Sequence, residues 1–151
     1  MTLYLVTGPP ASGKTTWVAE HAKHGDITID YDAIASALTP SNGDVYDQPK
    51  AVKAVTKAAR QAAIDTALGL AADTDVYVIH SMPSASLLER YKARGAQVVT
   101  VEPGADVVLA RCKQERPWQM VQAAKQWYAP PTERQGDDQS TIDLGQPSEA
   151  W

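Results

Sequence analysis

The chain has 151 residues, of which 44% are hydrophobic and 21% are charged. This length fits a single domain, and this composition excludes a wholly disordered chain. The formal net charge of −4 excludes a general electrostatic attraction to nucleic acids or to anionic membranes.

Acidic residues are concentrated near the carboxyl terminus. Residues 129–151 carry five acidic side chains and one arginine, whereas acidic and basic side chains balance over residues 1–128. We therefore expect a folded domain over residues 1–128 and an acidic, flexible tail over residues 129–151. Within the tail, we assign Thr141–Leu144 to flexible chain rather than to an edge strand.

The single cysteine, Cys112, excludes an internal disulfide and a structural zinc site built from cysteines. No apolar run approaches the ~20 residues that span a bilayer, and residues 1–11 lack the basic start of a signal peptide. We therefore expect a cytoplasmic protein that has no membrane partner.

Short β-rich runs alternate with longer helical segments along the chain. In chain order we expect a strand at 3–7, a helix at 14–24, a strand at 27–29, a helix at 50–72, a strand at 76–79, a helix at 86–95, a strand at 98–101, and helices at 106–115 and 118–128. Strands that alternate with helices in this way form parallel sheets covered by helices on both faces. The pattern therefore predicts an α/β fold.

Two finer predictions concern these helices. Ser86 and Glu89 have the spacing of a capping box, so we expect the helix at 86–95 to begin there. In the helix at 50–72, residues at 3.6-residue spacing form a stripe that we expect to face the core. The stripe consists of Val52, Val55, Ala59, Ala63, Thr66 and Leu70.

Residues 8–15 match the phosphate-binding pattern Gly-x-x-x-x-Gly-Lys-Ser/Thr without a gap, between a predicted strand and a predicted helix. The two glycines permit backbone angles at which successive N–H groups curl around a phosphate, and the helix adds its positive dipole end. Lys14 would reach the β- and γ-phosphates of ATP, and the Thr15 hydroxyl would ligate Mg²⁺. The predicted nucleotide-binding residues are Gly8, Pro9, Pro10, Ala11, Ser12, Gly13, Lys14, Thr15 and Thr16.

An acidic motif, Ile29-Asp30-Tyr31-Asp32, ends the second predicted strand. In an open α/β sheet, ligands bind at the carboxyl ends of the strands, beside the phosphate-binding loop. A carboxylate there can orient or deprotonate an acceptor hydroxyl, or hold a Mg²⁺ water. The structural alternative is that Asp32 caps the helix that begins at Ala33.

A third motif, residues 111–117, carries Arg111, Lys113 and Arg116. Arginines neutralise the charge that develops on phosphate oxygens, which favours a lid over the nucleotide. The alternative is a solvated helix end at which the cations offset the helix dipole.

The order of GPPASGKTTW, IDYD and RCKQERP resembles the small P-loop kinases. These include the kinase domains of bacteriophage polynucleotide 5′-hydroxyl kinases, chloramphenicol phosphotransferase and zeta-toxin-like kinases, often labelled AAA family ATPases. The resemblance covers residues 1–128 and implies a three-layer α/β/α P-loop NTPase sandwich with a parallel sheet of four to five strands, ordered 2-3-1-4. It also implies that Asp32 activates the acceptor and that Arg111 and Arg116 close over ATP.

The sequence departs from these relatives at two places. Ala35 stands where many of them carry an arginine that grips the acceptor. His80 and Ser81 end the third strand, where relatives often carry an aspartate that orders Mg²⁺. We therefore assign Mg²⁺ ligation to Thr15 and Asp30, and consider His80 either a contact to nucleotide or acceptor or a packed core residue.

Lys50, Lys53, Lys57 and Arg60 form a basic stripe in the region where such kinases hold their acceptor. We interpret the three lysines as a solvated helix face and keep Arg60 as a candidate acceptor contact.

Together these motifs predict an ATP- and Mg²⁺-dependent kinase that phosphorylates a hydroxyl of a nucleoside, a nucleotide or a DNA or RNA end. Two alternatives stay open. A nucleoside monophosphate kinase would need no general base, and a nucleotide-binding ATPase module would act through a partner. A preference for GTP also stays open, although the chain carries no Asn-Lys-x-Asp guanine signature.

Overall fold

The computed structural model describes residues 1–40, 49–70, 74–115, 117–130 and 142–144. Strands and helices alternate along these residues, as the sequence pattern predicts. In chain order the elements are β1 (Leu3–Thr7), α1 (Lys14–His21), β2 (Ile27–Asp30), α2 (Tyr31–Leu38), α3 (Lys50–Gly69), β3 (Val76–Ile79), α4 (Ala85–Ala93), β4 (Gln97–Thr100), α5 (Ala105–Glu115) and α6 (Pro117–Trp127).

The four described strands form one parallel sheet in the order β2-β3-β1-β4, which confirms the expected order. Leu5 of β1 pairs with Val78 of β3 on one side and with Val98 of β4 on the other. β1 lies inside the sheet and is apolar on both faces because helices cover both sides. All four strands end at one edge, next to the residues that follow β1.

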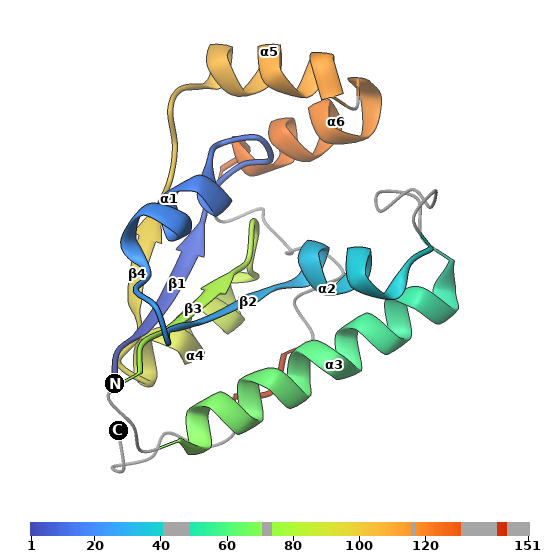
Figure 1. Ribbon diagram of the computed structural model, residues 1–151. Coiled ribbons are helices and arrows are strands. Elements are labelled where there is room, and N and C mark those ends of the chain that lie inside the picture. The colour runs from blue at the N-terminus through green and yellow to red at the C-terminus, as the bar shows by residue number, and fades with distance from the viewer. Residues whose placement is uncertain (41–48, 71–73, 116, 131–141, 145–151) are drawn as a thin grey trace.

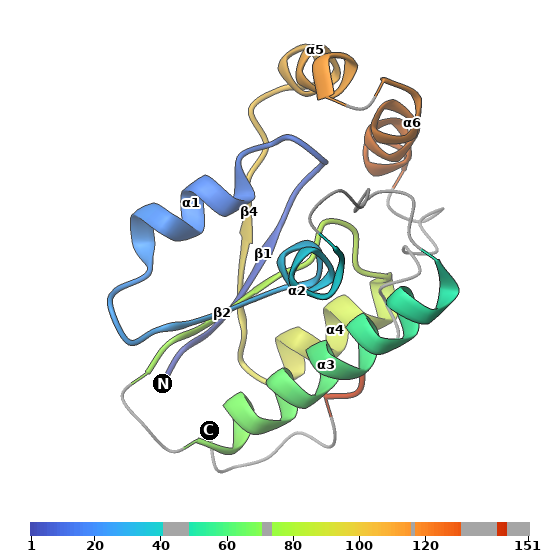
Figure 2. The same ribbon diagram turned by 45° about the vertical axis from the view of Figure 1, so that its right-hand side comes forward.

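Helices cover both faces of the sheet in a three-layer α/β/α sandwich, which confirms the predicted fold class (Figures 1 and 2). α1 lies on one face, and α3 and α4 lie on the other (Figure 2). α5 and α6 form a hairpin beyond the carboxyl ends of the strands (Figure 1). We call residues 105–127 the lid hairpin. None of the helices in the described part of the chain has the length and apolar character required to cross a membrane.

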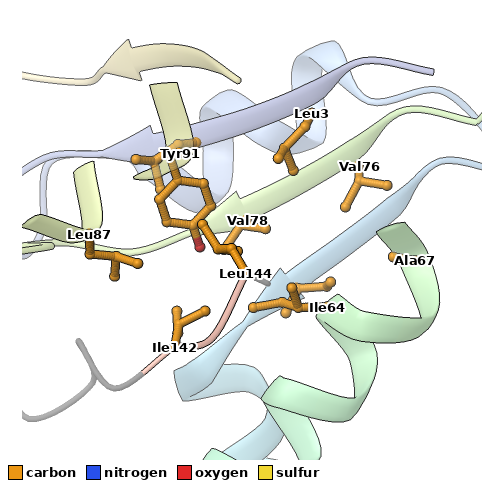
Figure 3. Close-up of a cluster of buried hydrophobic side chains, with 11 residues drawn as sticks. Leu3, Ile64, Ala67, Val76, Val78, Leu87, Tyr91, Ile142 and Leu144 are labelled. Atoms are coloured by element: carbon orange, nitrogen blue, oxygen red, sulfur yellow. The ribbon is translucent and has the colours of Figure 1, made fainter. Parts of the chain in front are cut away.

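The main core lies between the sheet and the face covered by α3 and α4. Side chains from the sheet, α3 and α4 meet there, and two further side chains come from the segment assigned above to the tail (Figure 3). Ile142 and Leu144 are each 3% exposed, whereas Asp143 between them faces solvent. We call Ile142–Leu144 the C-terminal strap.

Side chains of α3 and α4, and Arg94 directly after α4, form hydrogen bonds with the backbone of the strap. The Gln61 amide on α3 donates to the Asp143 carbonyl (2.5 Å) and accepts from the Asp143 N–H (2.8 Å), as a neighbouring strand would. Arg90 of α4 donates to the Ile142 carbonyl (3.2 Å), and Arg94 donates to the Leu144 carbonyl. An extended segment that places alternate side chains on one face explains why two apolar residues can be buried within a polar stretch.

The predicted buried stripe of α3 is wrong. Its buried residues are Thr56, Arg60, Ile64 and Ala67, whereas Val55 is 54% exposed and Leu70 is 43% exposed. The helix is rich in alanine, so few large apolar side chains define which face packs against the core. Thr56 satisfies its buried hydroxyl locally, because Oγ1 donates to the Val52 carbonyl at 2.7 Å.

Some helix ends differ from the predicted ones. The N-cap of α4 lies two residues before the predicted cap, because the hydroxyl of Ser84 rather than of Ser86 accepts from the Leu87 N–H (3.2 Å). α1 ends at His21, and Gly25 lies in the following turn rather than at the helix end. α2 begins at Tyr31, directly after β2, with Asp30 as its N-cap. The alternative role of Asp32 as the cap is therefore wrong.

Candidate functional site

The phosphate-binding loop, residues 8–15, lies between β1 and α1 at the carboxyl edge of the sheet. Gly8 has φ +155° and Gly13 has φ +98°, angles that glycine adopts most readily. A Cβ atom on Gly8 would lie 2.2 Å from the Val101 carbonyl oxygen, so a larger residue does not fit there. Ala11 has φ +59° and is the one non-glycine residue with positive φ in the described ranges.

Lys14, the first residue of α1, is buried at the base of this loop. Its Nζ donates to the Gly8 carbonyl (3.0 Å) and to the Pro9 carbonyl (2.7 Å). Burial lowers the pKa of Lys14 from 10.5 to about 8, and the nearby carboxylates of Asp32 and Asp30 oppose this shift. The amine is therefore mostly protonated at pH 7 and adds positive charge to the N-terminal end of α1.

A cavity of about 420 Å³ opens in front of the loop, within the range of small-molecule sites. The loop and the first turn of α1 contribute the lining residues Pro10, Ala11, Ser12, Gly13, Lys14, Thr15 and Thr16. Other segments contribute Asp30, Asp32, Ile79, Ser81, Arg111 and Met120. The structure thus brings Lys14, Thr15, Asp30, Asp32 and Arg111 to one cavity, although they come from three separate parts of the chain.

The two aspartates occupy different environments at the acidic side of the cavity. Asp30 is partly buried, and its Oδ1 accepts from the Asp32 N–H at 3.1 Å, which caps α2. Burial raises the pKa of Asp30. Asp32 is in the first turn of α2 and has an exposed side chain that lines the cavity. Asp30 therefore has a structural task that Asp32 does not share.

The lid hairpin contacts the loop from the other side. Arg111 Nη1 donates to the Ala11 carbonyl (3.1 Å), and the Cys112 thiol donates to the Pro10 carbonyl (3.7 Å). The two helices of the hairpin share a small core of Val108, Cys112, Met120 and Ala124, against which Ala11 packs. Arg116, the second predicted lid arginine, lies outside the described residues.

The remaining candidates do not line the cavity. Arg60 is 1% exposed, and its guanidinium carbon lies 5.2 Å from the centre of the Tyr31 ring. His80 is also 1% exposed and lies between two residues that do line the cavity. Lys50 is exposed, whereas Lys53 and Lys57 are half-buried on α3.

Sequence reasoning missed three lining residues, Ile79, Ser81 and Met120. Ile79 and Ser81 could have been identified from the expected strand order, because β3 ends beside the loop that follows β1. Met120 carries no comparable signal, since an apolar residue on a helix usually indicates core packing.

Comparison with known proteins identifies a family. The sequence model of the family described as "AAA domain" matches residues 3–130. No protein with a curated description matches the sequence. Among solved structures, the tunicamycin resistance protein of Deinococcus radiodurans is similar, with 19% sequence identity, a TM-score of 0.43, and coverage of 97% of this chain and 99% of that chain. With a family match over most of its length and a P-loop at the edge of a parallel sheet, the chain belongs to the AAA domain family and has a nucleotide-binding P-loop fold.

Proposed function

We propose that the protein is an ATP-dependent kinase that transfers the γ-phosphoryl group to a hydroxyl of a nucleoside, a nucleotide or a DNA or RNA end. The observation that carries this proposal is the meeting of Lys14, Asp32 and Arg111 at one cavity. Two positive groups and a carboxylate line that cavity together, and phosphoryl transfer to a hydroxyl needs both kinds of group.

The reaction assigns a separate task to each group. The acceptor oxygen attacks the γ-phosphorus, a new O–P bond forms, and the bond from the γ-phosphorus to the bridging oxygen of ADP breaks. The Asp32 carboxylate orients the acceptor hydroxyl and takes its proton. Lys14 and the loop N–H groups stabilise the charge on the phosphate oxygens, and Arg111 stabilises it from the lid.

The residues present fit a magnesium ion that accompanies ATP. Thr15 and Asp30 both line the cavity and offer a hydroxyl and a carboxylate oxygen, the donor types that Mg²⁺ prefers. No group of three ligating side chains occurs within the described ranges, which suits an ion that keeps several waters and takes substrate phosphates as ligands. When bound, the ion would neutralise charge on the β- and γ-phosphates.

The charge of the cavity favours a hydroxyl acceptor over the phosphate of a nucleoside monophosphate. The described lining residues next to α2 are Asp30 and Asp32, which would repel a phosphate acceptor. Arg60, the cation that could have gripped an acceptor phosphate, instead stacks on Tyr31 in the interior.

The test is a transfer assay with γ-labelled ATP and Mg²⁺ over nucleosides, nucleoside monophosphates, 5′-hydroxyl oligonucleotides and hydroxymethylated DNA. Lys14→Ala should abolish transfer, while the exposed control Lys23→Ala should not change it. Asp32→Asn should lower kcat much more than it weakens ATP binding. Transfer that survives Lys14→Ala would contradict the mechanism, and ATP binding without transfer to any acceptor would instead indicate a nucleotide-binding module.

A further inference from the structure

The carbonyl oxygen of Ser81, two residues after β3, accepts three hydrogen bonds from two different parts of the fold. Two donors lie where β1 meets the phosphate-binding loop: Thr7 Oγ1 at 2.8 Å and the Gly8 N–H at 3.3 Å. The third donor is the indole Nε1 of Trp127, the last residue of α6, at 3.0 Å. One acceptor therefore joins the end of the lid hairpin to the first residue of the loop.

The other end of the lid hairpin approaches the same glycine. Val101 begins the segment that leads from β4 to α5, and its carbonyl oxygen would lie 2.2 Å from a Cβ atom on Gly8. The Glu102 carboxylate then links the two ends of the hairpin, because it accepts from the Tyr128 hydroxyl and from the Gly104 N–H (2.7 Å). The segments at both ends of the lid hairpin are thus linked to each other through Glu102, and they lie next to Gly8 or its hydrogen-bond partner Ser81.

The middle of the hairpin donates hydrogen bonds to two loop carbonyl oxygens, those of Pro10 and Ala11, and its apolar core packs against Ala11. At the start of the loop, the Gly8 N–H donates to the Ser81 carbonyl, and Trp127 is the lid residue that donates to the same oxygen.

We propose that Trp127 is a positioning residue for nucleotide binding, which holds the first turn of the phosphate-binding loop in register with the lid hairpin through the Ser81 carbonyl. The proposal rests on the proposed binding of ATP at this loop. It assigns to Trp127 no contact with ATP itself. Without the indole N–H of Trp127, the Ser81 carbonyl would keep two of its three hydrogen-bond donors. The Gly8 N–H could then shift relative to the phosphates.

The test measures the dissociation constant of a non-hydrolysable ATP analogue with Mg²⁺ by calorimetry. Trp127→Phe keeps an aromatic ring in place and removes the donor, so the dissociation constant should rise about fivefold, the usual effect of one hydrogen bond. The matched control is Trp17→Phe on α1, where the indole packs against His21 and Tyr77. This control should leave the dissociation constant unchanged.

A double-mutant cycle separates positioning from a general loss of stability. Thr7→Val removes a second donor from the same Ser81 carbonyl. If Trp127 and Thr7 act together through the Ser81 carbonyl, the Thr7→Val/Trp127→Phe double variant should raise the dissociation constant by a factor that differs from the product of the two single-variant factors. The control double variant, Thr7→Val with Trp17→Phe, should raise it by the product of its own two single-variant factors. Thermal unfolding without nucleotide should show all variants folded at the assay temperature.

The outcomes also separate this inference from the proposed kinase activity. A Trp127→Phe dissociation constant within twofold of the wild type, or a cycle that gives the simple product, overturns the positioning role. Weaker binding with a coupled cycle supports it, even if the wild type transfers phosphate to no acceptor and the kinase proposal fails. A wild type that binds no ATP analogue overturns both.

Discussion

Arg111 of the lid hairpin donates a hydrogen bond of 3.1 Å to the carbonyl oxygen of Ala11, a residue held at φ +59° within the phosphate-binding loop. The bond joins the loop to the lid at the cavity that both residues line. Carbonyl oxygens repel phosphates, so a guanidinium paired with this carbonyl reduces that repulsion and favours anion binding.

Substitution of Arg111 should therefore weaken nucleotide binding as well as transfer. We expect Arg111→Ala to raise the KM for ATP about tenfold, because it removes both a charge at the cavity and the bond to Ala11. Lys113→Ala, which removes an exposed charge from the same helix, is the control and should change KM less than twofold. Equal effects of the two substitutions would mean that only the general charge of the hairpin matters.

Gly8→Ala should destabilise the fold by about 2–4 kcal/mol, because the new methyl group would meet the Val101 carbonyl in an unfavourable backbone conformation. Chemical denaturation checks this value. Gly69→Ala is the matched control: its Cβ would have no atom within 4 Å, and it lies at the end of α3, so it should be neutral or slightly stabilising. A stable Gly8→Ala variant would contradict the described approach of β4 to the loop.

The pH dependence of ATP use should reflect Lys14, whose pKa burial lowers to about 8. The protonated amine binds phosphate, so kcat/KM for ATP should fall as the pH rises above 8, by up to tenfold per pH unit. The free energy of unfolding should change in the opposite direction. Between pH 8 and 10.5 the unfolded chain still binds a proton at Lys14 that the folded chain has lost. The contribution of Lys14 to the free energy of unfolding therefore rises with pH in this range.

A pH–rate profile from pH 7.5 to 9.5 is the measurement. The Cys112 thiol interacts electrostatically with Lys14, so Cys112→Ala is the control that should keep the same break. A flat pH–rate profile in the wild type would contradict the prediction. A break that is present in the wild type but absent in Cys112→Ala would exclude Lys14 as the source of the break.

The capping role of Asp30 and the role of its charge can be tested separately. Asp30→Asn keeps a side-chain oxygen that can accept from the Asp32 N–H, whereas Asp30→Ala removes it and should cost about 1 kcal/mol of folding free energy. Both variants should require more Mg²⁺ for half-maximal activity, because neither retains the carboxylate. Thermal unfolding and a Mg²⁺ titration distinguish the two effects, and an unchanged Mg²⁺ requirement would leave Asp30 with the cap alone.

The C-terminal strap should contribute to stability as a core element does. Leu144→Ala should cost about 2–4 kcal/mol, since the side chain is 3% exposed, whereas the control Leu70→Ala removes a side chain that is 43% exposed and should cost much less. Gln61→Ala tests the backbone contacts of the strap and should cost about 1–2 kcal/mol. If urea denaturation found Leu144→Ala as stable as Leu70→Ala, the strap would not be part of the folded core.

The sheet and the phosphate-binding loop could be predicted because their signals are local. Contiguous residues make the loop motif, and each strand is a short apolar run followed by a turn. The strand order was expected from the resemblance to P-loop kinases, since periodicity alone does not say which strands pair.

The other differences arise from tertiary contacts that local patterns do not report. Arginine in a helix usually indicates a solvated face, but Arg60 is buried because the Tyr31 ring lies against its guanidinium. The acidic composition around Asp143 indicated flexible chain, but Gln61, Arg90 and Arg94 provide donors that match the strap backbone. These partners lie 50 or more positions away in the sequence.

The position of the strap in the chain also has a consequence for biosynthesis. Gln61 and Asp143 are 82 residues apart, so the contact that closes the interior beside α3 forms only after the entire lid hairpin has been translated. Until then the nascent polypeptide exposes apolar surface between α3 and α4, which chaperones can bind and which slows final folding. Expression of fragments that stop before residue 142 should accordingly yield aggregated material.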